Sequence, residues 1–175
     1  MDTTRKTLLL AKKIGEMSKC GSRKIGVIIE HREAIISIGY NGPVVPMDKE
    51  YLSEFFWSQL TDDEVLTLLG KYATKEQFLE TCTGCPRKLL GAGAGERSTL
   101  CACQHAEREA ISRAQKSLEG STMFAYCGIP CIDCAGAIVN AGISTLHCLD
   151  VKDYHPESRF LLKDIDVIQH APIPD

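Results

Sequence analysis

Two short stretches decide how this chain folds: Gln104-His105-Ala106-Glu107-Arg108-Glu109-Ala110-Ile111 and Pro130-Cys131-Ile132-Asp133-Cys134. Each has the pattern of a helix start. The first stretch runs into good helix formers, and the second opens with a proline, which a helix start tolerates because its missing N–H would have no partner there. Cys131 and Cys134 are three residues apart, so they share one face of the expected helix. Two helix N-termini directed at one point can therefore present an imidazole and two thiolates to a single metal ion.

The residue types at these positions are those of a zinc site. Zinc prefers nitrogen and thiolate ligands in a tetrahedron, and a catalytic zinc keeps one position open for water. We expect His105, Cys131 and Cys134 to supply three ligands. Glu107 is then free to move protons without binding the metal. The order H-x-E followed by P-C-x-x-C is the signature of the zinc-dependent nucleobase deaminases. Either half alone is a weak signal, since an isolated C-x-x-C is more often a structural zinc knuckle, a redox pair or two buried cysteines.

Length, charge and cysteine content narrow the class of protein. A chain of 175 residues predicts one domain, spanning residues 1–175. We find no apolar run typical of a membrane span or a signal peptide, so we expect no membrane association and a cytoplasmic location, which is the host cytoplasm for a viral chain. The net charge of −3 disfavours nucleic acid as a partner, because nucleic-acid-binding proteins usually carry a basic face. Nine cysteines in a reducing compartment indicate metal binding or catalysis rather than disulfides.

The hydrophobic pattern predicts an α/β fold. We expect a first helix over 3–19 and a hairpin of strands over 24–30 and 34–40. After residue 104, helices and strands alternate, with strands over 121–127, 143–149 and 167–168 and helices over 131–141 and 156–162. The helix over 131–141 connects the strands over 121–127 and 143–149, and it makes these two strands parallel neighbours with a right-handed crossover. The expected architecture is a three-layer α/β/α sandwich with a mixed five-stranded sheet, whose ligand-bearing helices begin at the carboxyl ends of strands.

A long insertion, at about residues 44–100, separates the hairpin from His105. The sequences from Thr61 to Glu64 and from Thr74 to Gln77 fit the capping box, so each predicts the start of a helix. An insertion of this length needs a stabilising link of its own next to the expected zinc site.

The remaining cysteines offer such a link. We expect a second, closed, structural zinc bound by Cys20, Cys82, Cys85 and Cys101, with Cys103 as a substitute for Cys20 or Cys101. A closed four-thiolate site contributes folding free energy directly. The alternative is that these cysteines are free thiols. Cys127 and Cys148 fall within predicted strands, and we interpret them as small core residues.

Taken together, the motifs resemble the deoxycytidylate (dCMP) deaminase branch of the cytidine deaminase superfamily. Besides the zinc-site motifs, the likeness lies in Ser18–Val27, Gly39–Pro43, Leu100-Cys101 and Asp153-Tyr154-His155. Several microbial and phage members carry an extra cysteine-bound zinc, in agreement with the second cluster. The chain departs from the family at Glu109, where asparagine is frequent, at Gly128-Ile129, where a polar or acidic approach is usual, and in the length of its insertion.

This resemblance implies a zinc-dependent hydrolytic deaminase that converts dCMP to dUMP and ammonia, with Glu107 as the proton-transfer residue. It also implies a homo-oligomer, often a hexamer, activated by dCTP and inhibited by dTTP, with Mg²⁺ accompanying a triphosphate effector. The family's contacts carried over here are Tyr40, Asn41 and Gly42 for the ribose or effector and Arg23, Lys24 and Tyr154 for the substrate phosphate. Arginine and tyrosine donate directed hydrogen bonds to phosphate oxygens. Each phosphate candidate fits a plain surface role equally well.

Two alternatives stay open at the level of the sequence. The same chemistry could act on dCTP or another cytosine nucleotide, and the sequence does not choose between dCMP and dCTP. The second alternative is a cysteine-rich zinc-binding interaction module without catalysis. Such a module has no need for Glu107, and it would bind DNA with a steep salt dependence.

Overall fold

The computed structural model describes residues 2–44, 49–71, 74–77, 85–93, 96, 100–151 and 155–173. The chain divides into two compact units. Unit 1 comprises Met1–Lys19, Arg23–Gly42 and Gln104–Asp175, and unit 2 comprises Cys20–Ser22 and Pro43–Cys103. Unit 1 therefore holds both motifs of the expected zinc site, and unit 2 holds the segment expected as a cysteine-bearing insertion.

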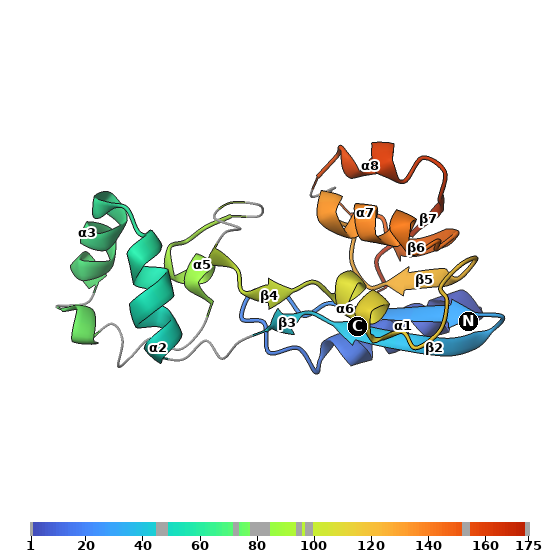
Figure 1. Cartoon of the computed structure of the whole chain (residues 1–175), viewed down its shortest axis with the longest axis horizontal. Helices are drawn as coiled ribbons and strands as arrows, with labels where there is room; N and C mark the ends of the chain where they lie inside the picture. Colours follow the sequence, from blue (N-terminus) through green and yellow to red (C-terminus); the bar gives the residue numbers. More distant parts are fainter. Residues whose placement is uncertain are drawn as a thin grey trace. The chain divides into compact units, whose positions relative to one another are not determined.

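A five-stranded mixed sheet forms the centre of unit 1 (Figure 1). In the order in which they lie side by side, its strands are β2 (Ala34–Tyr40), β1 (Gly26–His31), β5 (Thr122–Ala125), β6 (Thr145–Leu149) and β7 (Asp166–His170). β1 is antiparallel to β2 and to β5, whereas β5, β6 and β7 run parallel. The predicted hairpin and the predicted mixed five-stranded sheet are confirmed.

Helices cover both faces of this sheet, because alternate residues of each strand point to opposite sides. The helices of unit 1 are α1 (Thr3–Gly15), α6 (Ala106–Arg113), α7 (Ile132–Asn140) and α8 (Ser158–Leu161). Val27 and Ile29 of β1 pack in one buried cluster with residues of α6 and α7. Ile28 faces the other way, into a cluster with Leu8 and Ala11 of α1. The predicted three-layer α/β/α architecture is therefore confirmed, with α1 on one face and α6 and α7 on the other (Figure 1).

α1 ends earlier than its sequence pattern predicts. The expected helix reaches Lys19, but the last helical residue is Gly15. The N–H groups of Glu16 and Met17 bond to carbonyl groups three residues back, which tightens the final turn. A Cβ atom at Gly15 would lie 2.8 Å from the backbone nitrogen of Gly26. The glycine therefore allows β1 to begin directly beside the end of the helix.

Two strands of the sheet also differ in length from their predictions. β5 ends at Ala125 instead of Cys127, although the Tyr126 N–H still donates to the carbonyl oxygen of Gly26 and the carbonyl oxygen of Cys127 accepts from the Leu149 N–H. Cys127 therefore lies outside the strand itself, but it packs against the main hydrophobic cluster of unit 1, as expected of a core residue. β7 is longer than the expected 167–168, because all five of its residues pair with residues of β6.

Unit 2 is built from short helical segments around its own hydrophobic cluster. The segments are α2 (Lys49–Tyr51), the π-helix η1 (Leu52–Phe56), the 3₁₀-helix η2 (Trp57–Gln59), α3 (Asp62–Lys71) and α5 (Pro86–Leu89). The buried residues of the cluster are Leu52, Phe56, Leu68 and Leu100. Two short strands, β3 (Gly42–Pro43) and β4 (Cys103–Gln104), form a separate two-stranded sheet.

Both predicted capping boxes have side-chain caps. At α3, the Thr61 N–H donates to Glu64 Oε2 at 2.9 Å, and the Glu64 N–H donates back to Thr61 Oγ1 at 3.4 Å. The Gln77 N–H donates to Thr74 Oγ1 at 3.1 Å, and the residues after Gln77 lie outside the described ones up to residue 84. Within the described ranges, no helix combines the length and the hydrophobicity needed to cross a bilayer.

Candidate active site

The three expected ligands meet at the starts of two helices in unit 1. His105 is the N-cap of α6 and Cys131 is the N-cap of α7, and both have an extended backbone. The Nδ1 atom of His105 lies 3.3 Å from Sγ of Cys131 and 3.4 Å from Sγ of Cys134. The three ligand atoms all lie within 4.8 Å of one another. In the part of the chain that the structure describes, no other group of three His, Cys, Asp or Glu side chains is this compact.

This donor set fits zinc in both chemistry and geometry. Tetrahedral zinc, with Zn–S bonds of about 2.3 Å and Zn–N bonds of about 2.0–2.1 Å, separates a sulfur ligand from a nitrogen ligand by roughly 3.6 Å. The observed separations of 3.3 and 3.4 Å are close to that value. Both sulfur ligands are buried, and the helix N-termini stabilise negative charge on them. His105 Nδ1 and the two sulfurs would hold the ion and leave one tetrahedral position for water.

The ligands already influence one another's protonation. A hydrogen bond with Cys134 lowers the pKa of Cys131 to about 3, and the same bond raises the pKa of Cys134. A hydrogen bond to Cys131 raises the pKa of His105. Two sulfurs and an imidazole therefore share protons between them. A metal ion would take the place of those protons, because the ligating forms are thiolate and neutral imidazole.

Glu107 lies in the first turn of α6, beside these ligands. Its side chain is only 4 % exposed, and burial raises its pKa. Interactions with His105 and Cys134 oppose that rise. A buried carboxyl group with a raised pKa can hold a proton near neutral pH and pass it on, which is what general acid–base chemistry requires.

Similarity to known proteins identifies the family. A family model for the cytidine and deoxycytidylate deaminase zinc-binding region matches residues 1–149. The chain belongs to this deaminase family. The deoxycytidylate deaminase of Enterobacteria phage T4 is 34% identical over 144 residues, which are 79% of this chain and 73% of that protein. The deoxycytidylate deaminase of Schizosaccharomyces pombe is 24% identical over 166 residues, 93% of this chain but 42% of the yeast protein. The present chain therefore spans less than half the length of that relative.

A solved structure shares the fold of this deaminase. The dCMP deaminase from the cyanophage S-TIM5, in complex with dCMP and dUMP, superposes with a TM-score of 0.60 at 19% sequence identity. The match covers 97% of this chain and 99% of the phage chain. Family membership and the His–Cys–Cys cluster together make the site of this deaminase a zinc site.

Asn41, expected at the ribose or effector, binds the backbone of its own unit. Its Oδ1 accepts a hydrogen bond from the Ile25 N–H at 2.8 Å, and its Nδ2 donates to the carbonyl oxygen of Arg23 at 2.7 Å. The side chain is 6 % exposed. Asn41 therefore fastens the segment before β1 to the end of β2. Its contact with a nucleotide stays a prediction.

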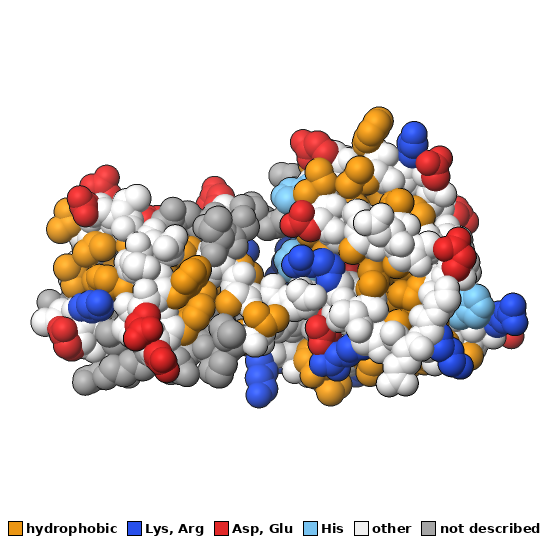
Figure 2. All heavy atoms as spheres, in the orientation of Figure 1, with side chains coloured by type: hydrophobic (Ala, Val, Ile, Leu, Met, Phe, Trp, Pro, Cys, Tyr) orange, Lys and Arg blue, Asp and Glu red, His pale blue; other side chains and the backbone are white. Residues whose placement is uncertain are grey.

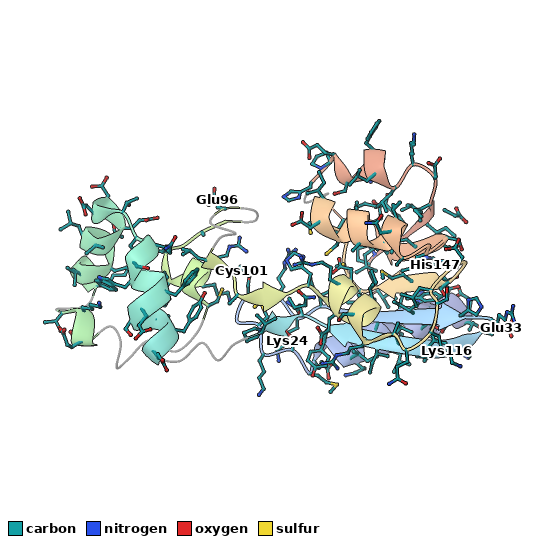
Figure 3. The ribbon with its side chains drawn as sticks, in the orientation of Figure 1. Lys24, Glu33, Glu96, Cys101, Lys116 and His147 are labelled. Carbon is teal, nitrogen blue, oxygen red and sulfur yellow. The ribbon has the colours of Figure 1, made fainter. Side chains whose placement is uncertain are left out.

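The other residues that we expect to contact the nucleotide lie in several different surroundings. Tyr40 lies under the guanidinium group of Arg113, which is 5.4 Å from the ring centroid. Lys24, labelled in Figure 3, donates from Nζ to the carbonyl oxygen of Glu16 at 3.4 Å. Arg23 is close enough to Cys127, beside Glu107, for its charge to oppose the rise in the pKa of that thiol. Gly42 begins β3, and Tyr154 lies outside the described residues.

Cys127 is a site residue that the strand pattern does not reveal. Its Sγ lies 4.0 Å from Oε1 of Glu107. In the sequence, the only sign of this contact is that Cys127 lies just before Pro130, in the segment that connects β5 to the zinc ligands.

Four cysteines gather in unit 2, among them Cys101 (Figure 3). Cys103 hydrogen-bonds to Cys101 and to Cys20, and its bond to Cys101 lowers the pKa of Cys101 to about 6. Cys85 lies against the same segment, because a Cβ atom on Gly21 would be 3.1 Å from Cβ of Cys85. Burial raises the pKa of Tyr51, and Cys101, Cys103 and Cys85 add to that rise. Cys82, the remaining expected ligand, lies outside the described residues.

Proposed function

We propose that this chain is a zinc-dependent deaminase that hydrolyses dCMP to dUMP and ammonia. The observation that carries the proposal is the placement of His105, Cys131, Cys134 and Glu107 in one buried site. Two kinds of relative support the choice of substrate. The phage T4 protein and the fission-yeast protein are named deoxycytidylate deaminases, and the cyanophage structure is a complex with dCMP and dUMP.

Three side chains of the site bind the metal, and the fourth transfers protons. A zinc ion held by His105, Cys131 and Cys134 would supply a water molecule activated for attack near neutral pH. Glu107 accepts a proton from the attacking water and delivers it to the ring nitrogen next to the reacting carbon. It then moves the second proton of that water to the departing amine. One water is consumed and one ammonia is released for each dCMP, and Glu107 returns to its starting state.

The substrate is tested by ammonia release from dCMP, dCTP, CMP, cytidine and deoxycytidine, each with and without dCTP and dTTP as effectors. We expect the highest kcat/KM for dCMP and a steep loss for deoxycytidine, which has no phosphate to bind. The highest kcat/KM with dCTP would assign the triphosphate as substrate instead. Absence of ammonia from every cytosine compound, with zinc present at one ion per site, would overturn the proposal.

The cysteine cluster of unit 2 supports a second, structural zinc. Cys103 links Cys101 to Cys20 through hydrogen bonds, so Cys103 is a better ligand candidate than its expected role as a substitute implies. Cys85 and Cys82 complete the set of candidates. Atomic absorption should find two zinc ions per chain, with one retained in His105→Ala and one lost in Cys101→Ser. A single zinc per chain in the wild type would remove the second site.

An oligomer is supported by the surface of α7 and α8. Hydrophobic side chains gather there (Figure 2), and the exposed ones are Ile132, Val139, Phe160 and Leu161. Phe160 is 75 % exposed. We expect a homo-oligomer, with a hexamer as the family implies, regulated by dCTP with Mg²⁺ and by dTTP through the Tyr40–Gly42 loop. Light scattering during size-exclusion chromatography measures the mass, and a monomer at assay concentration with either effector would contradict this expectation. The cytoplasmic location stays a prediction.

A further inference from the structure

The carboxyl group of Glu107 has two thiol neighbours. Sγ of Cys127 lies 4.0 Å from Oε1, within reach of an S–H···O hydrogen bond. Cys134 also hydrogen-bonds to Glu107, and the backbone N–H of Glu107 itself provides a third contact. No other side-chain donor to Glu107 is found in the described part of the chain.

Zinc would affect the two thiols differently. Cys134 ligates as a thiolate, which has no proton to donate to a carboxylate. Cys127 does not belong to the compact group of ligand atoms. Burial raises the pKa of Cys127 well above its ordinary value, so its thiol keeps its proton. In the zinc-loaded site, Cys127 is therefore the side-chain donor that remains for Glu107.

The backbone holds Cys127 in place for this contact. Its carbonyl oxygen accepts a hydrogen bond from the Leu149 N–H at 2.7 Å, which ties the residue to the end of β6. The same short segment, residues 126–131, leads into the zinc ligand Cys131. The donor to Glu107 and a metal ligand are thus carried on one tethered stretch of chain.

We propose that Cys127 is a positioning residue whose thiol donates to Oε1 of Glu107 and holds the carboxylate toward the zinc site. The inference rests on the proposed deamination, in which Glu107 must reach two different nitrogen atoms of the substrate. A fixed carboxylate serves both transfers, because a misplacement of about 1 Å in an active site can reduce the rate by roughly 100-fold.

A matched pair of variants tests the donor. Cys127→Thr and Cys127→Val have side chains of equal shape, and only threonine can donate. With dCMP as substrate, we expect Cys127→Thr to keep kcat within about threefold of the wild type and Cys127→Val to lose about tenfold, the low end for a hydrogen bond to a charged group. KM and zinc content should stay unchanged in both. Should the valine variant fail to fold, Cys127→Ser and Cys127→Ala repeat the comparison with smaller side chains.

Infrared spectroscopy tests the same contact without turnover. The difference spectrum between the wild type and Cys127→Thr isolates the S–H stretch of Cys127, and Glu107→Ala should shift that band to higher frequency because the hydrogen bond is lost. A band that does not respond to Glu107→Ala would overturn the contact, and equal kcat for the Thr and Val variants would overturn the positioning role. A wild type that releases no ammonia from dCMP would instead refute the proposed function, whatever the band shows.

Discussion

Nδ1 of His105 lies 3.3 Å from Sγ of Cys131, although the two residues are 26 positions apart in the chain. The contact arises because α6 ends at Arg113, β5 returns through the sheet, and α7 then begins next to the start of α6. Each residue is the N-cap of its helix, so the two helix starts define the site.

Replacing His105 removes one of the three ligands. We expect His105→Ala to lose the zinc ion of this site and to lose deamination of dCMP with it, because two thiolates alone leave the coordination incomplete. Zinc content by atomic absorption and ammonia release are measured on the same sample. His31→Ala, in the hairpin and bonded to Ser121, is the matched control and should keep both. Full zinc content in His105→Ala would show that the histidine is not a ligand.

Glu107 should be needed for turnover but not for the metal. We expect Glu107→Gln to keep its zinc and to lower kcat by about 10²–10⁴-fold, the usual contribution of a general acid–base residue. Glu109→Gln is the control on the same helix, since Glu109 forms a partly exposed ion pair with Arg113. Near-normal turnover by Glu107→Gln would refute the assigned role.

Gly39 allows α6 to lie close against β2. A Cβ atom there would collide with the backbone of Ala106 and Ala110, at the start and middle of the helix that carries Glu107. We expect Gly39→Ala to displace α6, to lower the free energy of unfolding by about 1–3 kcal/mol and to weaken zinc binding. Gly136→Ala, on α7, has no atom within 4 Å of the added Cβ and should be neutral or slightly stabilising. Unfolding in urea and zinc retention distinguish the two, and a stable, zinc-loaded Gly39→Ala would contradict the packing described.

The residues that could be predicted from the sequence are those whose position depends on local geometry. Helix starts place His105 and Cys131 at N-caps, and a spacing of three puts Cys134 on the same helix face as Cys131, so local geometry predicts these residues as candidate ligands. The strand pattern predicts a core position for Cys127, and Cys127 does pack against the main hydrophobic cluster. Its contact with Glu107 could not be predicted in this way, because it depends on how close α6 lies to the end of β5.

Contacts between segments that are distant in the sequence could not be predicted from local helix and strand geometry. The sequence Asn41-Gly42-Pro43 predicts a turn, but the two hydrogen bonds of Asn41 to the backbone at Arg23 and Ile25 require the segment before β1 to lie beside it. The early end of α1 has the same origin, since it depends on the close approach of Gly15 and Gly26. The capping box of α3, by contrast, is local, and both of its predicted hydrogen bonds are present.

A histidine pair on the far side of the sheet predicts a loss of stability in acid. Nδ1 of His147 lies 2.8 Å from Nε2 of His170, and the His147 ring stacks on Phe124. Burial and the neighbouring His170 lower the pKa of His147, against an opposing effect of Asp166. The unfolded chain therefore binds more protons than the folded one below about pH 6.5. The contribution of His147 to the free energy of unfolding should be fully present above that pH. It should be lost as the pH falls through the lowered pKa of His147 in the folded state.

Urea unfolding at a series of pH values from about 8 to 5 measures this effect. We expect the midpoint of the wild type to fall over the acid part of the series, and the fall to be smaller in His147→Leu, which cannot titrate at this position. The same slope in both proteins would exclude the histidine pair as its cause.

Removal and return of the metal test whether deamination depends on the zinc ion. Zinc is stripped from the wild type with a chelator, ammonia release from dCMP is measured, and zinc is then added back while its content is followed. We predict that ammonia release disappears with the zinc bound by His105, Cys131 and Cys134 and returns when that site is refilled. A protein free of zinc and of other metals that still releases ammonia at the wild-type rate would contradict this prediction.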